Sequence, residues 1–274
     1  MNVVLNHGIF GFDTFHGISY FNGIAEHLKA RFPDLRILTA QVPAAGTITV
    51  RGKQLHNQIL QALQPGGALN ANEPIHIIAH SMGGLDARFL LSPDNPASIA
   101  DRVISLTTIS TPHKGSPIAD LLVKLLDPLD LFSEEKQLAQ IIRSRLSEVG
   151  IETGGLRHLT GESVGRFNDQ FADNPATLKF SVAGVGRDKK FLGIHLNTCG
   201  ALRLAYLVIK EITGEDNDGL VSLSSATWGG EPEIWFADHA DEIGHDLDFG
   251  LQAQTSHLNY FDKYEAIIKK LKQL

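Results

Sequence analysis

Apolar residues along this chain fall into two alternating patterns, short continuous runs and longer segments with helical spacing. The continuous runs are typical of buried parallel strands, and the spaced segments are typical of amphipathic helices. Their alternation predicts an α/β fold, with a mainly parallel sheet of about six strands and helices on both faces. The expected strands are 3–6, 35–42, 75–79, 103–109, 178–185 and 233–237, and the expected helices are 20–31, 51–63, 201–213 and 258–271.

The third expected strand runs directly into a helical pattern, with Ser81 at the junction. A sharp reversal from strand to helix requires small residues two positions before and two positions after the serine. Ala79 and Gly83 meet that requirement, and Gly84 follows. A serine that merely caps a helix is the simpler alternative, but it does not need these small neighbours. The pattern therefore favours a nucleophile elbow at Ser81.

The alternation of strand and helix patterns stops between residues 112 and 177, where no strand pattern occurs. Ile118, Leu121, Leu122 and Leu125 share one helical face, and a more charged helical segment follows at 134–149. Two interpretations stay open. The helices pack permanently on the sheet, or they form a lid over Ser81 whose apolar face is lined by the leucines.

Composition limits the class of protein further. A length of 274 residues fits one domain, 1–274, and we expect 112–177 to be a helical lid or cap insertion. A net charge of −7 argues against a nucleic-acid partner, and no apolar run is long enough to span a bilayer. A single cysteine excludes an internal disulfide. The first strand pattern follows Met1 and Asn2 directly, which predicts a cytoplasmic location unless a leader has been removed.

A serine hydroxyl needs a histidine to take its proton and a carboxylate to orient that histidine. In an elbow fold the acid follows the serine along the chain, and the histidine follows the acid. The candidates in the required order are Asp216 and Asp218 for the acid, and His239, His245 and His257 for the base.

Local context separates these candidates. Asp218 is favoured because Gly219 lets the loop turn tightly beside it. His239 is favoured because it follows the last expected strand at once, whereas His257 stands at the start of the closing helix. The sequence therefore predicts a triad of Ser81, Asp218 and His239.

Four motifs resemble those of the bacterial and fungal triacylglycerol lipases of the α/β-hydrolase superfamily. They are His7–Asp13, Arg51–Leu55, the elbow with its continuation 108–116, and Asn217–Val221. The likeness covers most of the chain outside the insert. It implies a serine carboxylic-ester hydrolase that acts on lipid esters through an acyl-enzyme and without a cofactor, with a lipid–water interface as a candidate place of action.

The resemblance also implies residue roles. The backbone N–H groups of Ile9 and Met82 would form the oxyanion hole, and Arg51 would brace the oxyanion loop. Related lipases place His-Leu-Asp-Glu-Ile around the catalytic histidine, and His239–Ile243 matches that sequence. Ser256-His257-Leu258 superficially resembles the Asn-His-Leu sequence that also surrounds the catalytic histidine in these lipases.

Related bacterial lipases often hold a structural calcium near the catalytic histidine, at positions that correspond here to Asn197, Asp241 and His245. Only one of the three is a carboxylate, and calcium prefers several hard oxygen ligands. We therefore expect no tightly bound calcium. A short-chain esterase, an acyltransferase and a non-catalytic lipid-binding module remain the alternative functions at this point.

Overall fold

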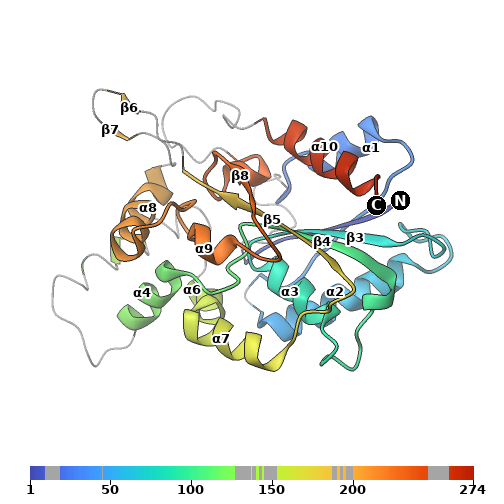
Figure 1. The fold of residues 1–274 in the computed structure, drawn as a ribbon, viewed down its shortest axis with the longest axis horizontal. Coiled ribbons are helices and arrows are strands. Elements are labelled where there is room, and N and C mark those ends of the chain that lie inside the picture. Colours follow the sequence, from blue (N-terminus) through green and yellow to red (C-terminus); the bar gives the residue numbers. More distant parts are fainter. Residues whose placement is uncertain are drawn as a thin grey trace.

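The computed structural model describes residues 1–9, 19–44, 46–126, 137, 140–141, 144, 153–186, 190–191, 194–195, 200–245 and 259–274. Within these ranges the chain forms a six-stranded sheet in the order β2-β1-β3-β4-β5-β8, and every pairing in it is parallel (Figure 1). The strands are β1 (Asn2–Asn6), β2 (Arg36–Thr39), β3 (Ile75–His80), β4 (Val103–Ile109), β5 (Leu178–Gly184) and β8 (Glu233–Trp235). A small antiparallel pair joins β6 (Lys190–Phe191) to β7 (Ile194–His195). The predicted α/β fold is confirmed.

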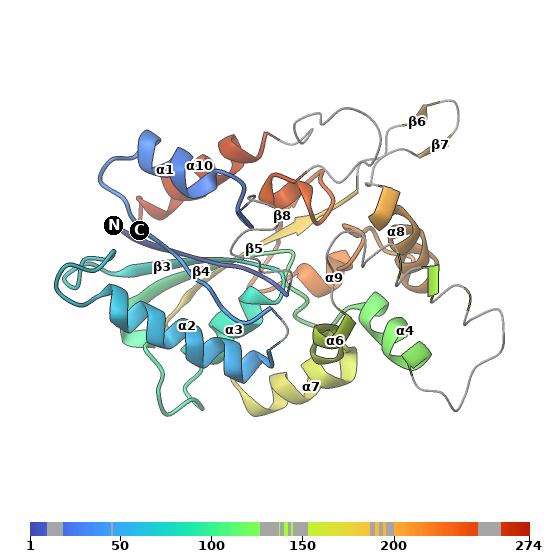
Figure 2. The ribbon, with the colours of Figure 1, turned by 180° about the vertical axis from the view of Figure 1, so that it is seen from behind.

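Helices cover both faces of the sheet, as Figures 1 and 2 show from opposite sides. On one face α1 (Ile24–Arg31) lies beside α10 (Tyr260–Leu271), and on the other α2 (Ile48–Ala62) lies beside α3 (Gly83–Leu91). Strand β1 shows why the strands are apolar throughout. Val3 and Leu5 join the core under α1 and α10, whereas Val4 joins the core under α2 and α3. Successive side chains point to opposite faces, so a strand covered twice must be apolar at every position.

The remaining helical elements gather beyond one end of the sheet (Figure 2). They include three pieces of the insert, α4 (Pro117–Leu126), α6 (Thr153–Leu156) and α7 (Gly161–Gln170), together with α8 (Gly200–Thr213) and α9 (Leu223–Ala226). Short 3₁₀ turns occur at Ala100–Arg102, Arg157–Leu159 and Asp241–Ile243. No helix in the described part of the chain is long and apolar enough to cross a membrane.

Part of the insert is fixed firmly to the body of the molecule. Ile118 and Leu122 are buried in a core cluster that also contains Ile9 and Met82. Asp173, just beyond α7, accepts hydrogen bonds from Arg88 Nε at 2.8 Å and from the Trp228 indole at 2.7 Å. The side chain of Leu125 and most of 134–149 lie outside the described residues. The packing of α4 is compatible with a closed lid as well as with a permanent cover.

Several element boundaries differ from those expected. The helix expected at 20–31 begins at Ile24, after Gly23 in the left-handed region with φ +66°. The helix expected at 51–63 begins three residues earlier, at Ile48, because the Thr47 side chain accepts a hydrogen bond from Val50 N and caps it. The strand expected at 35–42 ends at Thr39 and that at 233–237 ends at Trp235. The apolar pattern continues past each strand because the loops that follow bury Ala40, Val42 and Ala237.

Candidate active site

Ser81 lies between the carboxyl end of β3 and the start of α3, at φ +56°. Left-handed backbone is uncommon for a residue other than glycine and is a form of strain that clusters at functional sites. The surroundings hold it there. Ser81 N donates to the Ile109 carbonyl oxygen at 2.9 Å, and the Ser81 carbonyl oxygen accepts from Thr111 Oγ1 at 2.8 Å. The tip of the turn is therefore tied to β4 and to the loop that follows it.

Close contacts with neighbouring atoms leave no room for a side chain at the glycines around the turn. A Cβ on Gly83 would lie 2.5 Å from the Asn6 carbonyl oxygen, and one on Gly84 would lie 2.1 Å from Thr111 Oγ1. Gly8 approaches from β1, where a Cβ would lie 2.6 Å from Ser81 Cβ. The end of β1 thus passes directly beside the serine, which brings the backbone of the Gly8–Ile9 step to the elbow.

Asp218 and His239 are joined side chain to side chain. His239 Nδ1 lies 2.6 Å from Asp218 Oδ2, and both side chains are buried. A carboxylate accepts, so Nδ1 carries the proton in this bond. The other carboxylate oxygen, Oδ1, accepts from the amides of Leu220 at 2.8 Å and Val221 at 2.7 Å. The tight turn comes from Gly219 at φ +96°, so the acid is held rigidly toward the imidazole.

The backbone supports the same pair. His239 N donates to the Asp218 carbonyl oxygen at 3.0 Å, so the loop after β8 is paired to the acid's loop. The His239 ring lies 4.4 Å from the ring of His80, the residue that precedes Ser81. The structure thereby brings the elbow, Asp218 and His239 to one place at the carboxyl edge of the sheet, where α/β folds hold their ligands.

The alternative candidates lie in other surroundings. Asp216 is exposed and pairs with Lys210 Nζ at 2.8 Å. His245 Nε2 donates to the carbonyl oxygens of Ser19 at 3.0 Å and Tyr20 at 2.9 Å, and burial lowers its pKa. His257 lies outside the described residues.

Arg51 is fully buried beneath the loop that leaves β1. Its guanidinium donates to the carbonyl oxygens of His7 at 2.6 Å and Pro43 at 2.6 Å, and pairs with the Asp86 carboxylate at 2.8 Å. Burial raises the pKa of Asp86 to about 6, against the opposing effect of Arg51. Because the charged Arg51 side chain holds the His7 carbonyl oxygen, it fixes the direction in which the backbone continues to Gly8 and Ile9.

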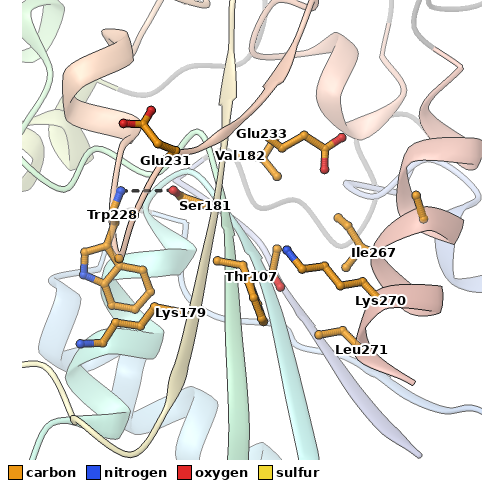
Figure 3. A pocket seen from close by; sticks show the side chains of 14 residues that line it. Thr107, Lys179, Ser181, Val182, Trp228, Glu231, Glu233, Ile267, Lys270 and Leu271 are labelled. Atoms are coloured by element: carbon orange, nitrogen blue, oxygen red, sulfur yellow. Dashed lines mark hydrogen bonds between the residues drawn. The ribbon is translucent and has the colours of Figure 1, made fainter. Parts of the chain in front are cut away.

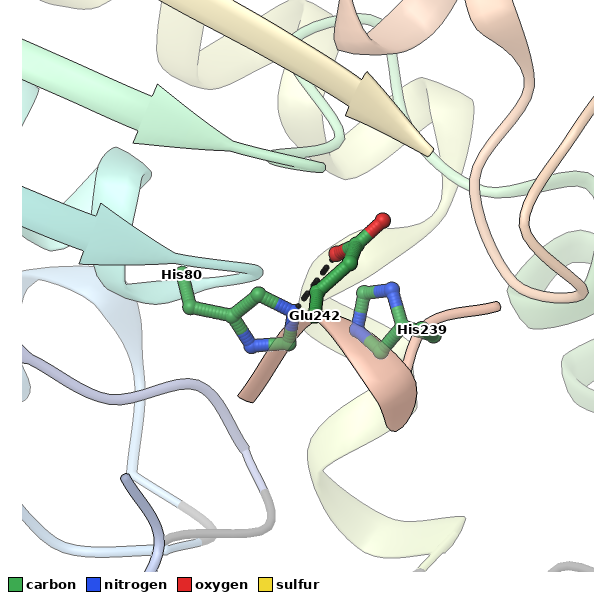
Figure 4. Close-up of side chains that lie close together, drawn as sticks. All are labelled: His80, His239 and Glu242. Atoms are coloured by element: carbon green, nitrogen blue, oxygen red, sulfur yellow. Dashed lines mark hydrogen bonds and ion pairs between the residues drawn. The ribbon is translucent and has the colours of Figure 1, made fainter. Parts of the chain in front are cut away.

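Sequence reasoning missed a second buried network beside the candidate triad. His80 Nε2 bonds Glu242 Oε2 at 2.9 Å, and Figure 4 shows this pair next to the ring of His239. The His80 Nδ1 atom lies 2.6 Å from the Tyr20 hydroxyl oxygen, and Glu242 Oε1 lies 2.6 Å from Ser110 Oγ. A histidine within an apolar strand pattern looks like an ordinary core residue, and only the position of Glu242 three residues after His239 could have drawn attention to it.

A metal site requires several ligand atoms close together. In the described ranges, His80, His239 and Glu242 form the one group of three potential ligands, with their atoms within 4.8 Å of one another. Hydrogen bonds already join these side chains to one another or to Tyr20 and Asp218. Of the calcium positions, Asn197 lies outside the described residues, and His245 binds backbone carbonyls. The expected lack of tight calcium binding stays a prediction.

A separate hollow of about 120 Å³ lies against β5 and α10 (Figure 3). Lys179, Trp228 and Lys270 are among its lining residues, and Lys270 Nζ sits 3.9 Å from the centre of the Phe180 ring. The lining includes none of the candidate triad residues. The chemistry described above therefore does not extend into this hollow.

A parallel sheet in this order, with a strained serine turn after β3 and a carboxylate–histidine pair on later loops, defines an α/β hydrolase. Residues 51–177 match the family model described as the PGAP1-like alpha/beta domain. The chain is 30% identical to the triacylglycerol lipase of Vibrio cholerae over an alignment of 288 positions, which covers 98% of this chain and 87% of that protein. Triacylglycerol lipase 2 of Saccharomyces cerevisiae is 29% identical over 215 residues, which cover 77% of this chain but 58% of the yeast protein.

Solved structures show the same fold. Staphylococcus hyicus lipase superposes with a TM-score of 0.68 at 20% identity, over 99% of this chain and 95% of that one. The chain belongs to the triacylglycerol lipase family, and it is a carboxylic-ester hydrolase.

Proposed function

We propose that this chain hydrolyses lipid esters through an acyl-enzyme formed on Ser81, with His239 as general base and Asp218 as its orienting acid. The Ser81 hydroxyl oxygen attacks the ester carbonyl carbon while His239 takes the hydroxyl proton. The protonated His239 then gives that proton to the leaving alcohol oxygen as the ester bond breaks. Water then attacks the acyl carbonyl carbon while His239 takes its proton. The bond between the acyl group and the Ser81 oxygen breaks, His239 returns the proton to that oxygen, and the fatty acid leaves.

The observation that carries this proposal is the buried 2.6 Å bond between His239 and Asp218 beside the elbow. The bond holds the imidazole in one tautomer, which leaves Nε2 as the nitrogen that exchanges protons with the substrate and Ser81. As the imidazole gains a proton, the Asp218 carboxylate stabilises the new positive charge across that short distance.

The tetrahedral intermediate carries a negative oxygen, for which we propose the backbone N–H groups of Ile9 and Met82. Met82 stands at the start of α3, where helix amides and the helix dipole favour negative charge. Ile9 follows Gly8, whose backbone packs against the Ser81 side chain. The buried Arg51 supports this loop through the His7 carbonyl.

The substrate class follows from relatives that are named triacylglycerol lipases. A fluorophosphonate probe tests the nucleophile. We expect the wild type to be labelled and folded Ser81→Ala to remain unlabelled, since the probe requires an activated serine. Labelling that persists in Ser81→Ala would show that another residue is the nucleophile.

Rates on p-nitrophenyl esters of rising chain length test the lipid assignment. We expect kcat/KM to rise from short to long acyl chains in the wild type, because a longer chain buries more apolar surface on the enzyme. A maximum at the shortest esters, falling steadily with length, would identify a short-chain esterase instead.

A further inference from the structure

A continuous chain of hydrogen bonds links the end of β1 to the loop after His239. Gly8 N donates to the Tyr20 hydroxyl oxygen at 3.0 Å, and that hydroxyl lies 2.6 Å from His80 Nδ1. His80 Nε2 continues to Glu242 Oε2 at 2.9 Å. These four residues are buried, and they lie on segments far apart in the sequence.

A backbone amide orients the first hydrogen bond of this chain. The Tyr20 oxygen accepts from Gly8 N, so its own proton goes to His80 Nδ1. His80 then carries its proton on Nε2 and donates to Glu242. Burial lowers the pKa of His80 well below its ordinary value, which agrees with a neutral ring.

Glu242 also receives a donor from the opposite side. Ser110 Oγ accepts from Gly184 N at 3.0 Å, so the Ser110 hydroxyl proton goes to Glu242 Oε1 at 2.6 Å. Both carboxyl oxygens are therefore acceptors, and each is matched to one donor. The ionised side chain of Glu242 satisfies this pattern. The isosteric glutamine has one acceptor oxygen and would place its NH₂ group, which is a donor, against the other donor.

The backbone at both sides of Glu242 is strained. In the described residues, Ser81 and Ser110 are the two with positive φ that are not glycine, at +56° and +43°. Ser81 directly follows His80, and Ser110 is the partner of Glu242. Strained backbone persists where the surrounding contacts determine it, and the contacts here converge on Glu242.

Placing Glu242 there has an electrostatic cost. Burial and the nearby Asp218 charge raise the pKa of Glu242 well above the ordinary range and so oppose its ionisation, whereas the hydrogen bond from Ser110 lowers the pKa and favours the carboxylate. Gly184 is wedged against both acids, since a Cβ on it would lie 1.8 Å from Glu242 Oε1 and 2.8 Å from Asp218 Cβ. A pair of apolar side chains would fill this space at lower cost, so packing alone does not account for the acid.

We propose that Glu242 is a positioning residue which, through His80 and Tyr20, fixes the Gly8–Ile9 backbone relative to the Ser81 elbow and the His239 ring. The inference rests on the proposed roles of Ser81, His239 and the Ile9 amide. Glu242 touches no reacting atom in this account. It acts on the geometry of the oxyanion loop, so its loss affects the transition state more than substrate binding.

The test is a double-mutant cycle of Tyr20→Phe and Glu242→Gln, with kcat and KM measured on a soluble p-nitrophenyl ester well below each melting temperature. A misplacement on the order of 1 Å can cost about 100-fold, so each variant should lose between about 10-fold and 100-fold in kcat. KM should stay within about twofold of the wild type. Since both changes break the same chain, the double variant should lose no more than about twofold beyond the worse single variant.

Tyr264→Phe is the matched control. Tyr264 is fully buried, and its hydroxyl has no hydrogen-bond partner in the described part of the chain. Removing this hydroxyl should leave kcat within about twofold. Should Glu242→Gln fail to fold, the comparison of Tyr20→Phe with Tyr264→Phe still decides the question.

Multiplying losses in the double variant, an unchanged kcat in Tyr20→Phe or in Glu242→Gln, or an equal loss in Tyr264→Phe would each overturn the inference. The cycle is run beside Ser81→Ala. Activity that survives in Ser81→Ala would refute the proposed nucleophile, whereas an inactive Ser81→Ala with an unchanged Tyr20→Phe would refute the positioning role alone.

Discussion

Single atoms decide whether the elbow can form, and Gly8 is the clearest case. A methyl group there would lie 2.6 Å from Ser81 Cβ, 2.8 Å from the Tyr20 hydroxyl oxygen and 2.9 Å from Ser81 Oγ. Carbon and oxygen atoms do not approach so closely without bonding, so the strand or the serine must move. The same atom would also disturb the start of the hydrogen-bond chain through Tyr20.

Gly8→Ala should therefore lower kcat by about 100-fold or more, because the displaced Ser81 loses its alignment with the Ile9 amide proposed for the oxyanion hole. Gly165→Ala in α7 is the control, since a Cβ there meets nothing within 4 Å. It should leave kcat unchanged and raise the free energy of unfolding by about 0.5–1 kcal/mol, because alanine favours a helix interior over glycine. Steady-state kinetics and thermal melts of both variants check this, and full activity in Gly8→Ala would contradict the close packing.

Individual helices depend on a few residues at their ends and faces. Helix α1 is linked to α10 by Glu265, which pairs with His27 at 3.0 Å, with Arg31 at 3.4 Å and with Lys269 at 3.0 Å. Hydrogen bonds from Lys269 and His27 lower the pKa of Glu265 to about 2. The contacts of Glu265 with His27 and Arg31 connect α10 to α1.

This carboxyl makes stability dependent on acid pH. The folded pKa of Glu265 lies below its ordinary value of 4.5, so its stabilising effect is present above about pH 4.5 and is lost as the pH falls toward 2. Glu265→Gln should be less stable than the wild type at pH 6, and the difference should shrink through that window. Urea denaturation at several pH values measures it. Glu162→Gln, which removes a surface pair with Arg166, should show no such convergence, and a constant Glu265→Gln difference would refute the linkage.

Whether helix α4 is a lid or a permanent cover can be tested at two of its leucines. Leu122 is buried in the cluster that contains Ile9 and Met82, whereas Leu121 is half-buried at its edge. If α4 opens toward lipid, Leu121→Ser should depress hydrolysis of long-chain emulsions more than that of a short soluble ester. Leu122→Ser should in addition lower the melting temperature, because it leaves a polar group and a cavity in the core. Equal losses on both substrates in Leu121→Ser would favour a permanent cover.

At the scale of the whole molecule, the sequence predicted the parallel sheet because strands covered on both faces leave an unbroken apolar pattern, as Val3–Leu5 does. It also predicted the pairing of Asp218 and His239, since the order of serine, acid and histidine follows from the elbow. The spacing of apolar residues does not show where a helix begins. Thr47 caps α2 and Gly23 precedes α1, and both shift a boundary by a few residues.

The buried network around His80 lay beyond the sequence for another reason. Its partners, Tyr20 and Glu242, are 60 and 162 residues away along the chain. No local pattern distinguishes such a histidine from one in an ordinary core. Only the fold brings β1, β3 and the loop after β8 together.

The central claim is that His239 serves Ser81 as general base, and the turnover of His239→Ala compared with that of His257→Ala tests it most directly. Because triad members act as a unit, His239→Ala should lose at least about 10³-fold in kcat on a p-nitrophenyl ester, with a melting temperature close to that of the wild type. His257→Ala should retain most of its activity. The reverse result, an active His239→Ala beside an inactive but folded His257→Ala, would contradict the account.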